Sequence, residues 1–257
     1  MNRLHNLFKN KKSNLLSVFY TAGFPKLDDT TSIGKHLAEA GADLIEIGIP
    51  FSDPIADGPV IQQSNKRALE NDMNVKLLLE QVKQLRHEIS IPILLMGYLN
   101  PVVQFGMERF CEQAGAAGVD GLILPDLPLP EFERDYRKIF EENKLSVVFL
   151  VSPTTSTERI EKIDRLSNGF IYAVSASSTT GARKDFSEAQ IAYFEKLKTM
   201  KLSNPLLIGF GISNQATFRA ACQYAAGAIV GSAFIKILEG STDLRKDIVE
   251  FVNELKG

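Results

Sequence analysis

The sequence predicts an α/β protein that folds as a single (β/α)8 TIM barrel, and three observations support this fold class. Short β-branched runs alternate with amphipathic stretches of ten or more residues, the pattern of a parallel sheet with helical crossovers. Eight such units of ~32 residues account for a chain of 257 residues. A glycine recurs where a helix would end before the next strand, at Gly41, Gly118 and Gly227.

The expected elements follow one another in strict alternation. The eight strands are expected at residues 15–20, 43–49, 92–96, 121–124, 147–151, 169–174, 205–208 and 228–230. The helices are expected at residues 28–40, 60–71, 75–87, 108–114, 130–143, 157–166, 188–200, 214–222 and 243–255, with shorter helical segments after the last two strands. No Pro-, Gly- or Ser-rich linker divides the chain, so residues 1–257 are predicted to form one domain. An open, doubly wound parallel sheet is the alternative.

Composition excludes several classes of protein. The 29 basic and 31 acidic residues are spread along the chain, and a net charge of −2 offers no footprint for nucleic acid or an anionic membrane. The two cysteines, Cys111 and Cys222, form no C-x-x-C pair and indicate a reducing, cytoplasmic compartment. His5, His36 and His87 lack metal-ligand spacing, so we predict no metal site. No apolar run approaches the ~20 residues that span a bilayer.

The strand expected at 43–49 carries a carboxylate on its inward face. With a period of two, the isoleucines at 45, 47 and 49 face the outer helices, whereas Glu46 points into the barrel between Leu44 and Gly48. A buried carboxylate is unfavourable unless it is paired, hydrogen-bonded or neutralised. Glu46 is therefore either half of a structural ion pair or a catalytic acid or base.

The loop after that strand, Pro50-Phe-Ser-Asp-Pro-Ile-Ala-Asp-Gly-Pro59, adds Asp53 and Asp57. Such βα loops build the active sites of barrel enzymes. Two carboxylates in different settings can take separate acid and base roles. The alternative is a turn with an aspartate cap before a helix that carries Pro59 in its first turn.

Glycine-rich loops follow the last two predicted strands, Gly209-Phe-Gly-Ile-Ser213 and Gly231-Ser-Ala233. In barrels, loops at these positions commonly bind phosphate through backbone N–H groups, although glycines also serve tight turns. The polar segment 175–183, after the sixth strand, is either a lid or a long loop.

The predicted strands lack residues that two classes of aldolase require. No predicted strand contains a lysine, which disfavours a Schiff-base aldolase, and the lack of a metal site disfavours a metal-dependent one. Carboxylate acid–base chemistry on a phosphorylated ligand remains. Tyr172 shares an inward face with Phe170 and Val174, where it either offers a hydroxyl or packs as a core aromatic.

Several segments together resemble one enzyme family. Glu46-Ile-Gly-Ile-Pro-Phe-Ser-Asp-Pro-Ile-Ala-Asp-Gly-Pro59 resembles the signature of the tryptophan synthase α subunit family. Further blocks of that family are matched in the same order by Leu94-Leu-Met-Gly-Tyr-Leu-Asn-Pro101, Gly121-Leu-Ile-Leu-Pro-Asp-Leu-Pro128, Gly209-Phe-Gly-Ile-Ser213 and Gly231-Ser232. The resemblance covers essentially the whole chain.

The resemblance implies a lyase that cleaves indole-3-glycerol phosphate to indole and glyceraldehyde 3-phosphate by a retro-aldol step. Glu46 matches the family's acid/base, which protonates indole C3 and helps to deprotonate the glycerol hydroxyl, and Asp57 matches the carboxylate at the indole N–H. Phosphate contacts are implied for Gly181, Gly211, Gly231 and Ser232, and indole-pocket contacts for Ile61, Tyr98 and Tyr172.

The resemblance also implies a partner. In the family, the loops around Asp53 and Thr180 couple to a pyridoxal-phosphate β subunit in an α2β2 heterotetramer, which receives the indole through a tunnel and makes L-tryptophan. The α chain itself carries no cofactor. Where the family has Gly-Val-Thr-Gly, this chain has Ser178-Thr-Thr-Gly181. Because serine tolerates a positive φ poorly, loop closure or coupling to the partner is expected to differ.

Two other hypotheses fit parts of the pattern. A different phosphate-binding barrel enzyme, such as phosphoribosylanthranilate isomerase or indoleglycerol-phosphate synthase, would share the glycine loops, but the latter would carry a catalytic lysine on a strand. A regulatory subunit that only activates a β partner would not need both Glu46 and Asp57.

Overall fold

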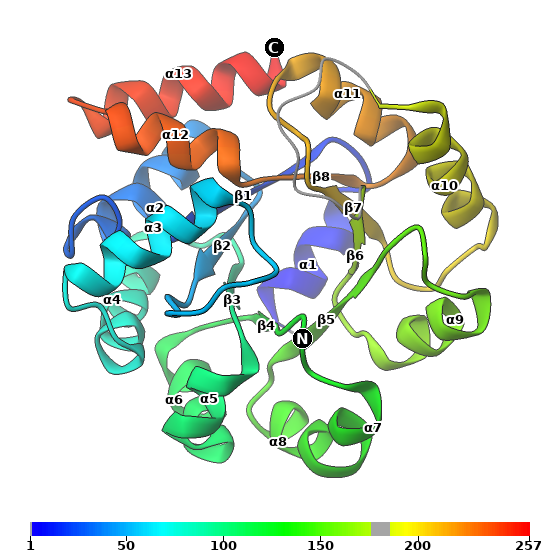
Figure 1. Cartoon of the computed structure of the whole chain (residues 1–257), viewed down its shortest axis with the longest axis horizontal. Helices are drawn as coiled ribbons and strands as arrows, with labels where there is room; N and C mark the ends of the chain where they lie inside the picture. Colours follow the sequence, from blue (N-terminus) through cyan, green and yellow to red (C-terminus); the bar gives the residue numbers. More distant parts are fainter. Residues whose placement is uncertain (1, 176–185) are drawn as a thin grey trace.

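The computed structural model describes residues 2–175 and 186–257, which form a closed barrel of eight parallel strands surrounded by helices (Figure 1). The strands are β1 (Leu15–Thr21), β2 (Leu44–Gly48), β3 (Ile93–Met96), β4 (Gly121–Ile123), β5 (Ser146–Val151), β6 (Ile171–Val174), β7 (Leu206–Gly209) and β8 (Gly227–Val230). They neighbour one another in sequence order, and β8 pairs with β1. All eight predicted strands are confirmed, and the closure confirms a barrel rather than an open sheet.

Except for the first helix, which precedes β1, the helices follow the strands and form the outer layer. They are α1 (Arg3–Asn10), α2 (Asp29–Ala40), α3 (Pro59–Glu70), α4 (Val75–Glu88), α5 (Leu99–Phe105), α6 (Met107–Ala117), α7 (Leu129–Glu131), α8 (Arg137–Glu142), α9 (Thr157–Leu166), α10 (Glu188–Thr199), α11 (Gln215–Tyr224), α12 (Ser232–Gly240) and α13 (Leu244–Lys256). The nine helices predicted by residue range are confirmed to within a few residues, except that a π-helical turn, Phe132–Tyr136, divides the helix expected at 130–143. Neither α1 nor α5 was predicted.

The two unpredicted helices are short, so each shows too few turns for a periodic pattern. The Asn2 side chain caps α1 by accepting a hydrogen bond from the His5 amide. The seven residues of α5 include Pro101 in the first turn, where a missing N–H removes no intrahelical hydrogen bond. Asn2 thus caps α1 locally, whereas α5 begins without a side-chain cap at Tyr98, and the Leu99 amide donates instead to the Asp126 carboxylate at 2.8 Å.

Alternation along the strands divides the apolar residues into two layers. An inner cluster receives one side chain or more from every strand, including Leu15, Leu44, Leu94, Ile123, Val148, Tyr172, Leu207 and Ile229. Ile45, Ile47 and Ile49 belong instead to the outer cluster between the strands and the helices. The predicted orientation of β2 is therefore confirmed, and with it the inward direction of Glu46.

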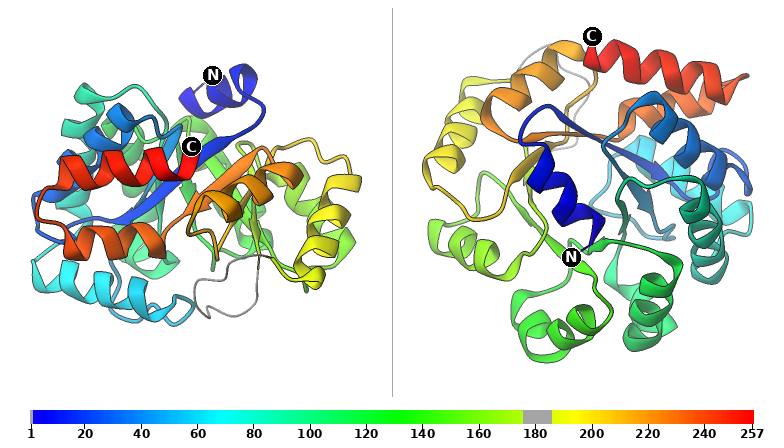
Figure 2. Two further views of the ribbon diagram at one scale, coloured as in Figure 1. Left: turned by 90° about the horizontal axis from the view of Figure 1, so that it is seen from above. Right: turned by 180° about the vertical axis from the view of Figure 1, so that it is seen from behind.

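Helix α1 closes the N-terminal end of the barrel (Figure 2, right). Its Leu4 and Phe8 side chains are buried in the inner cluster, and the Phe8 ring centroid lies 5.9 Å from that of Phe170. Beside the helix, the Asp120 carboxylate accepts hydrogen bonds from the Ile93 amide (3.0 Å) and from Arg86 Nη2 (3.1 Å). This end of the barrel is thus packed and hydrogen-bonded, which is typical of the stabilising face of the fold.

We expect Leu4→Ala to lower the free energy of unfolding by about 3 kcal/mol, because the lost methyl groups leave a cavity at the base of the barrel. Leu4→Met, which conserves volume, is the matched control and should cost less than about 1.5 kcal/mol. Urea denaturation followed by circular dichroism measures both. Equal losses in the two variants would show that α1 does not close the core.

Candidate active site

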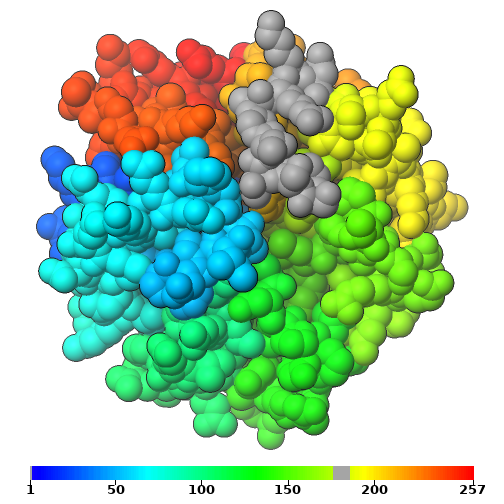
Figure 3. Space-filling model, viewed as in Figure 1, coloured from blue at the N-terminus to red at the C-terminus, as the bar shows by residue number. Residues whose placement is uncertain are grey.

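The candidate site lies at the other end of the barrel, where the strands end and the βα loops begin. Figures 1 and 3 view the molecule from this side, opposite α1, and the segment that follows β2 projects from the centre of this face. Its central residue is Glu46 on β2, whose side chain is fully buried. Glu46 Oε1 accepts a hydrogen bond from Ser17 Oγ at 2.7 Å, while Oε2 has no hydrogen-bond partner among the described residues.

The electrostatic state of Glu46 follows from this environment. Burial raises the pKa of the Glu46 carboxyl to about 7, and the Ser17 hydrogen bond, which favours the anion, opposes part of that rise. Among the residues described, Glu46 does not take part in an ion pair, so the structural ion pair that the sequence left open is not formed. A carboxyl that titrates near neutral pH and has one free oxygen is suited to give and to take protons.

Asp57 lies in the loop between β2 and α3 and has different surroundings. Burial raises its pKa to about 6, opposed by a hydrogen bond from Tyr98 Oη to Asp57 Oδ2 at 3.3 Å. The same hydroxyl accepts a hydrogen bond from the Ala56 amide at 3.0 Å, and the Phe51 ring centroid lies 5.1 Å from that of Tyr98. Tyr98 therefore holds the loop and the carboxylate together.

Helix α3 fixes the other side of this loop. The Asn65 side chain accepts a hydrogen bond from the Phe51 amide at 3.0 Å, and Gln62 Nε2 donates to the Asp57 carbonyl at 2.9 Å. Pro59 is the first residue of α3, as predicted, but the N-cap is Gly58, without a side-chain hydrogen bond. Neither aspartate is therefore used to cap α3. Asp53, earlier in the same loop, is exposed and accepts a hydrogen bond from the Ser52 hydroxyl.

Tyr172 on β6 completes the polar part of the interior. Burial, together with the nearby charges of Glu46 and Asp57, raises the pKa of its hydroxyl well above the ordinary value, so the hydroxyl stays protonated and able to donate. Space for the ring comes from β7, because a Cβ on Gly209 would lie only 2.2 Å from Tyr172 Oη. Phe210 packs edge-on against the ring at 6.1 Å. No sequence pattern indicates this role for Gly209.

The glycines after β7 and β8 leave backbone groups accessible to a ligand. Gly211 adopts a left-handed conformation, with a φ of 77°. Gly231 is the N-cap of α12 and makes no side-chain capping bond, and Ser232 begins the helix. The first N–H groups of such a helix have no intrahelical partner and carry positive potential, so they favour an anion. Thr180 and Gly181, together with Ser178 and Thr179, lie outside the described residues.

Ile61, predicted for the indole pocket, lies in the helix that follows the Asp57 loop. It belongs to the first turn of α3 and packs in the outer cluster between strands and helices, not in the inner cluster that contains Tyr172. The structure therefore brings Glu46, Asp57, Tyr98 and Tyr172 to one end of the barrel, and the indole-pocket role of Ile61 stays a prediction.

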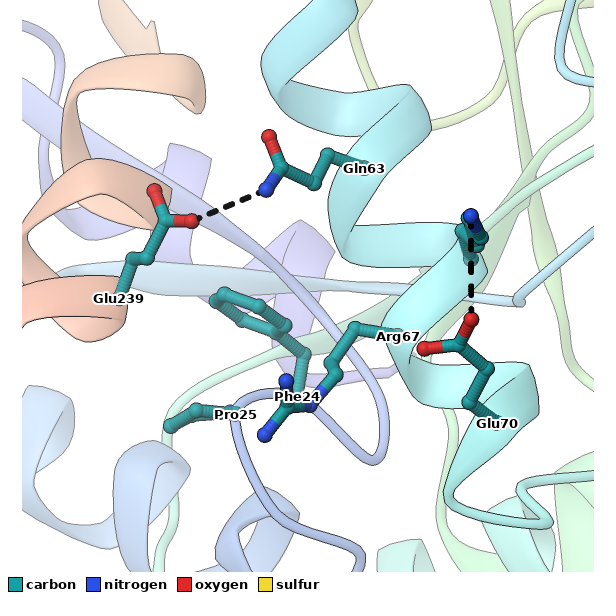
Figure 4. A pocket seen from close by; sticks show the side chains of 7 residues that line it. Phe24, Pro25, Gln63, Arg67, Glu70 and Glu239 are labelled. Carbon is teal, nitrogen blue, oxygen red and sulfur yellow. Dashed lines mark hydrogen bonds and ion pairs between the residues drawn. The ribbon is translucent and has the colours of Figure 1, made fainter.

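A separate pocket of about 240 Å³ lies on the side of the barrel (Figure 4). It is lined by Phe24, Pro25, Gln63, Lys66, Arg67, Glu70 and Glu239. Its two cationic and two anionic side chains cancel, and Gln63 donates to Glu239 at 3.2 Å. No predicted site residue lines it. Within residues 2–175 and 186–257, no three His, Cys, Asp or Glu side chains gather to hold a metal ion, and no helix has the length and apolarity to cross a bilayer.

Comparison with known proteins gives consistent matches along the chain. The family model for the tryptophan synthase alpha chain matches residues 5–257. The tryptophan synthase alpha chain of Bacteroides thetaiotaomicron is 49% identical over 256 residues, covering 100% of both chains. That of Flavobacterium psychrophilum is 49% identical over 255 residues, covering 99% of this chain and 100% of the relative.

Solved structures of tryptophan synthase superpose on this chain over nearly its whole length. Tryptophan synthase subunit alpha from Legionella pneumophila superposes with a TM-score of 0.88 at 36% identity, covering 100% of this chain and 97% of that one. A chain of tryptophan synthase from Mycobacterium tuberculosis gives a TM-score of 0.90 at 31% identity, covering 99% and 97%.

The raised pKa of Glu46 makes folding stability depend on pH. The ordinary pKa of 4.5 applies to the unfolded chain, so between that pH and about 7 the folded chain binds more protons, and stability falls as the pH rises through this window. We expect Glu46→Gln, which cannot titrate, to gain about 3 kcal/mol relative to the natural chain between pH 4 and pH 8.

Urea denaturation of both chains at a series of pH values measures this gain. Glu161→Gln, at an exposed position on α9, is the matched control for the chemical change itself. A stability difference between Glu46→Gln and the natural chain that stays constant with pH would contradict the raised pKa.

Proposed function

Because the chain belongs to the tryptophan synthase alpha chain family, we propose that Glu46 and Asp57 are the carboxylates with which it cleaves indole-3-glycerol phosphate to indole and glyceraldehyde 3-phosphate. The observation that carries this assignment is the pair of carboxyls at the C-terminal end of the barrel, with pKa values raised to about 7 and about 6 by separate environments. Residues 1–257 act in this proposal as one catalytic domain.

Breaking the carbon–carbon bond of this substrate requires two proton movements. Indole C3 must gain a proton, and the hydroxyl on the adjacent glycerol carbon must lose one as the aldehyde forms. Glu46 supplies the first and helps with the second, since a carboxyl with a pKa of about 7 is populated in both protonation states near neutral pH. Its buried Oε2, which has no other hydrogen bond among the described residues, is free for this exchange.

Asp57 handles the charge that develops at the other end of the indole ring. Protonation at C3 leaves the ring nitrogen cationic, and an anionic carboxylate held at the N–H stabilises that cation. The loop anchored by Tyr98 and α3 presents the Asp57 carboxylate with its backbone already fixed. No rearrangement of that loop is then needed as the charge appears.

The remaining contacts of the proposed site are those with the phosphate and those with the indole ring. The backbone around Gly211, Gly231 and Ser232 binds the phosphate, supported by the free N-terminus of α12. Gly181 is assigned to the phosphate by resemblance alone. Tyr98 and Tyr172 line the indole pocket, supported by their positions beside Asp57 and Glu46. Ile61 stays a prediction, because its packing in the outer cluster gives it no support.

The indole passes to a β subunit that makes L-tryptophan, and we propose that this occurs in a cytoplasmic α2β2 heterotetramer. Two of the most exposed large apolar side chains among the described residues lie in the units that follow β2 and β3: Ile55 is 88% exposed and Val103 49%. Ile55 is two residues from Asp53 in the same loop, and exposed apolar side chains of this kind suit contact with a protein partner. Thr180 is assigned to the same coupling by resemblance.

We expect Glu46→Gln to lower the rate of indole release at least about 100-fold, because a general acid–base group is lost. Asp57→Asn should lower it by a similar factor through loss of the charge opposite the ring nitrogen. Purified chains are incubated with indole-3-glycerol phosphate, alone and with a β subunit, and indole is measured. Circular dichroism confirms that each variant is folded.

The same assay on the natural chain distinguishes a catalytic α subunit from a regulatory subunit that only activates the β subunit. Activation of the β subunit without indole release from the natural chain would favour the regulatory hypothesis. Full activity in Glu46→Gln would remove Glu46 from the mechanism while leaving the family assignment intact.

The phosphate site can be tested at Gly231, where an added methyl group would not clash with the rest of the protein. A Cβ there would approach Phe19 no closer than 3.5 Å, an ordinary contact, so Gly231→Ala should fold normally. If phosphate binds this backbone closely, the added methyl group raises KM about tenfold or more with little change in kcat. Gly240→Ala, at the other end of α12, where a Cβ meets no atom within 4 Å, is the matched control. Equal KM values in both variants would place the phosphate elsewhere.

A further inference from the structure

A serine inside the barrel is the only side chain among the described residues that hydrogen-bonds to Glu46. Ser17 lies on β1, fully buried, and its hydroxyl donates to Glu46 Oε1 at 2.7 Å. In register with it are Leu44 on β2 and Ile229 on β8, both in the apolar inner cluster. An aliphatic side chain would suit such apolar neighbours, so packing alone gives no reason for a hydroxyl here.

The surroundings of Glu46 leave Ser17 as the group that can orient it. The residues in register with Glu46 on the neighbouring strands are Phe19 on β1 and Leu94 on β3, and neither can hydrogen-bond through its side chain. The charged or titratable groups that act electrostatically at this end of the barrel are Tyr172 from β6 and Asp57 from the loop after β2. Without Ser17, the carboxyl would have no described side-chain partner to fix its plane.

We propose that Ser17 is a positioning residue that holds one oxygen of Glu46 so that the other, Oε2, is presented to the substrate. This inference rests on the proposed role of Glu46 as the acid/base. Donation of a hydrogen bond to Oε1 fixes the rotation of the carboxyl group and keeps the exchangeable proton on Oε2. It also favours the anionic form, so Ser17 keeps the group titrating near neutral pH instead of higher.

The test uses two isosteric variants that differ in one hydroxyl group. Ser17→Thr keeps the donor, and Ser17→Val has nearly the same shape without it. We expect Ser17→Val to lower kcat about tenfold, to leave KM for indole-3-glycerol phosphate nearly unchanged, and to move the Glu46 limb of the kcat–pH profile to higher pH. Ser17→Thr should restore most of kcat and the natural position of that limb.

If the larger side chains of Ser17→Thr and Ser17→Val do not fit the inner cluster, Ser17→Ala provides the test. It removes the hydroxyl without adding volume and should show the same loss of kcat and the same direction of pH shift as Ser17→Val. The positioning role is overturned if the pH limb stays in place in both Ser17→Ala and Ser17→Val, or if Ser17→Thr and Ser17→Val lower kcat equally in folded chains.

Failure of this inference is separable from failure of the proposed function. If Glu46→Gln is inactive while the three Ser17 variants keep the natural pH profile, Glu46 is the acid/base and Ser17 does not position it. If Glu46→Gln is fully active, the assignment of Glu46 fails first, and the Ser17 proposal fails with it.

Discussion

The parallel pairing of β8 with β1 closes the sheet, and the closed sheet has an interior in which side chains are buried. Every inward side chain must then pack or hydrogen-bond within the barrel, and at the N-terminal end apolar residues and α1 fill this space. Toward the C-terminal ends of the strands the interior becomes more polar, because Ser17, Glu46 and Tyr172 are among the inward groups. The chemistry of the site depends on this gradient, because burial without a paired cation is what raises the pKa of Glu46.

The two proposed catalytic carboxylates differ in how they are held. Glu46 is fixed by a strand of the barrel wall and, among the described residues, accepts a single side-chain hydrogen bond, from the neutral hydroxyl of Ser17. Asp57 is fixed by a loop, which is in turn held by Tyr98 on one side and by α3 on the other. A wall position is rigid and dry, which suits proton transfer, whereas a loop position lets a charge lie beside a ring nitrogen at the mouth of the barrel. One fold thus holds the two carboxylates in different environments.

Several residues that look unremarkable in the sequence support this arrangement. Gly209 has no Cβ because the Tyr172 hydroxyl occupies that space, and the side chains of Asn65 and Gln62 hydrogen-bond to the backbone of the loop. Such residues have no motif, because their role exists only when two segments distant in sequence meet. The π-helical turn between α7 and α8 likewise has no counterpart in the hydrophobic pattern that predicted one helix there.

The sequence by itself determined the order of the strands, the inward face of β2 and the positions of Glu46 and Asp57, because periodicity and motif spacing are local properties of a chain. The sequence did not predict the two short helices α1 and α5, since the Asn2 cap of α1 and the proline in the first turn of α5 leave little periodic signal. Only the tertiary structure decided that Glu46 is paired with a serine rather than a cation and that Tyr98 links Ala56 to Asp57. These outcomes depend on which side chains meet across the closed sheet, and a linear pattern does not encode such contacts.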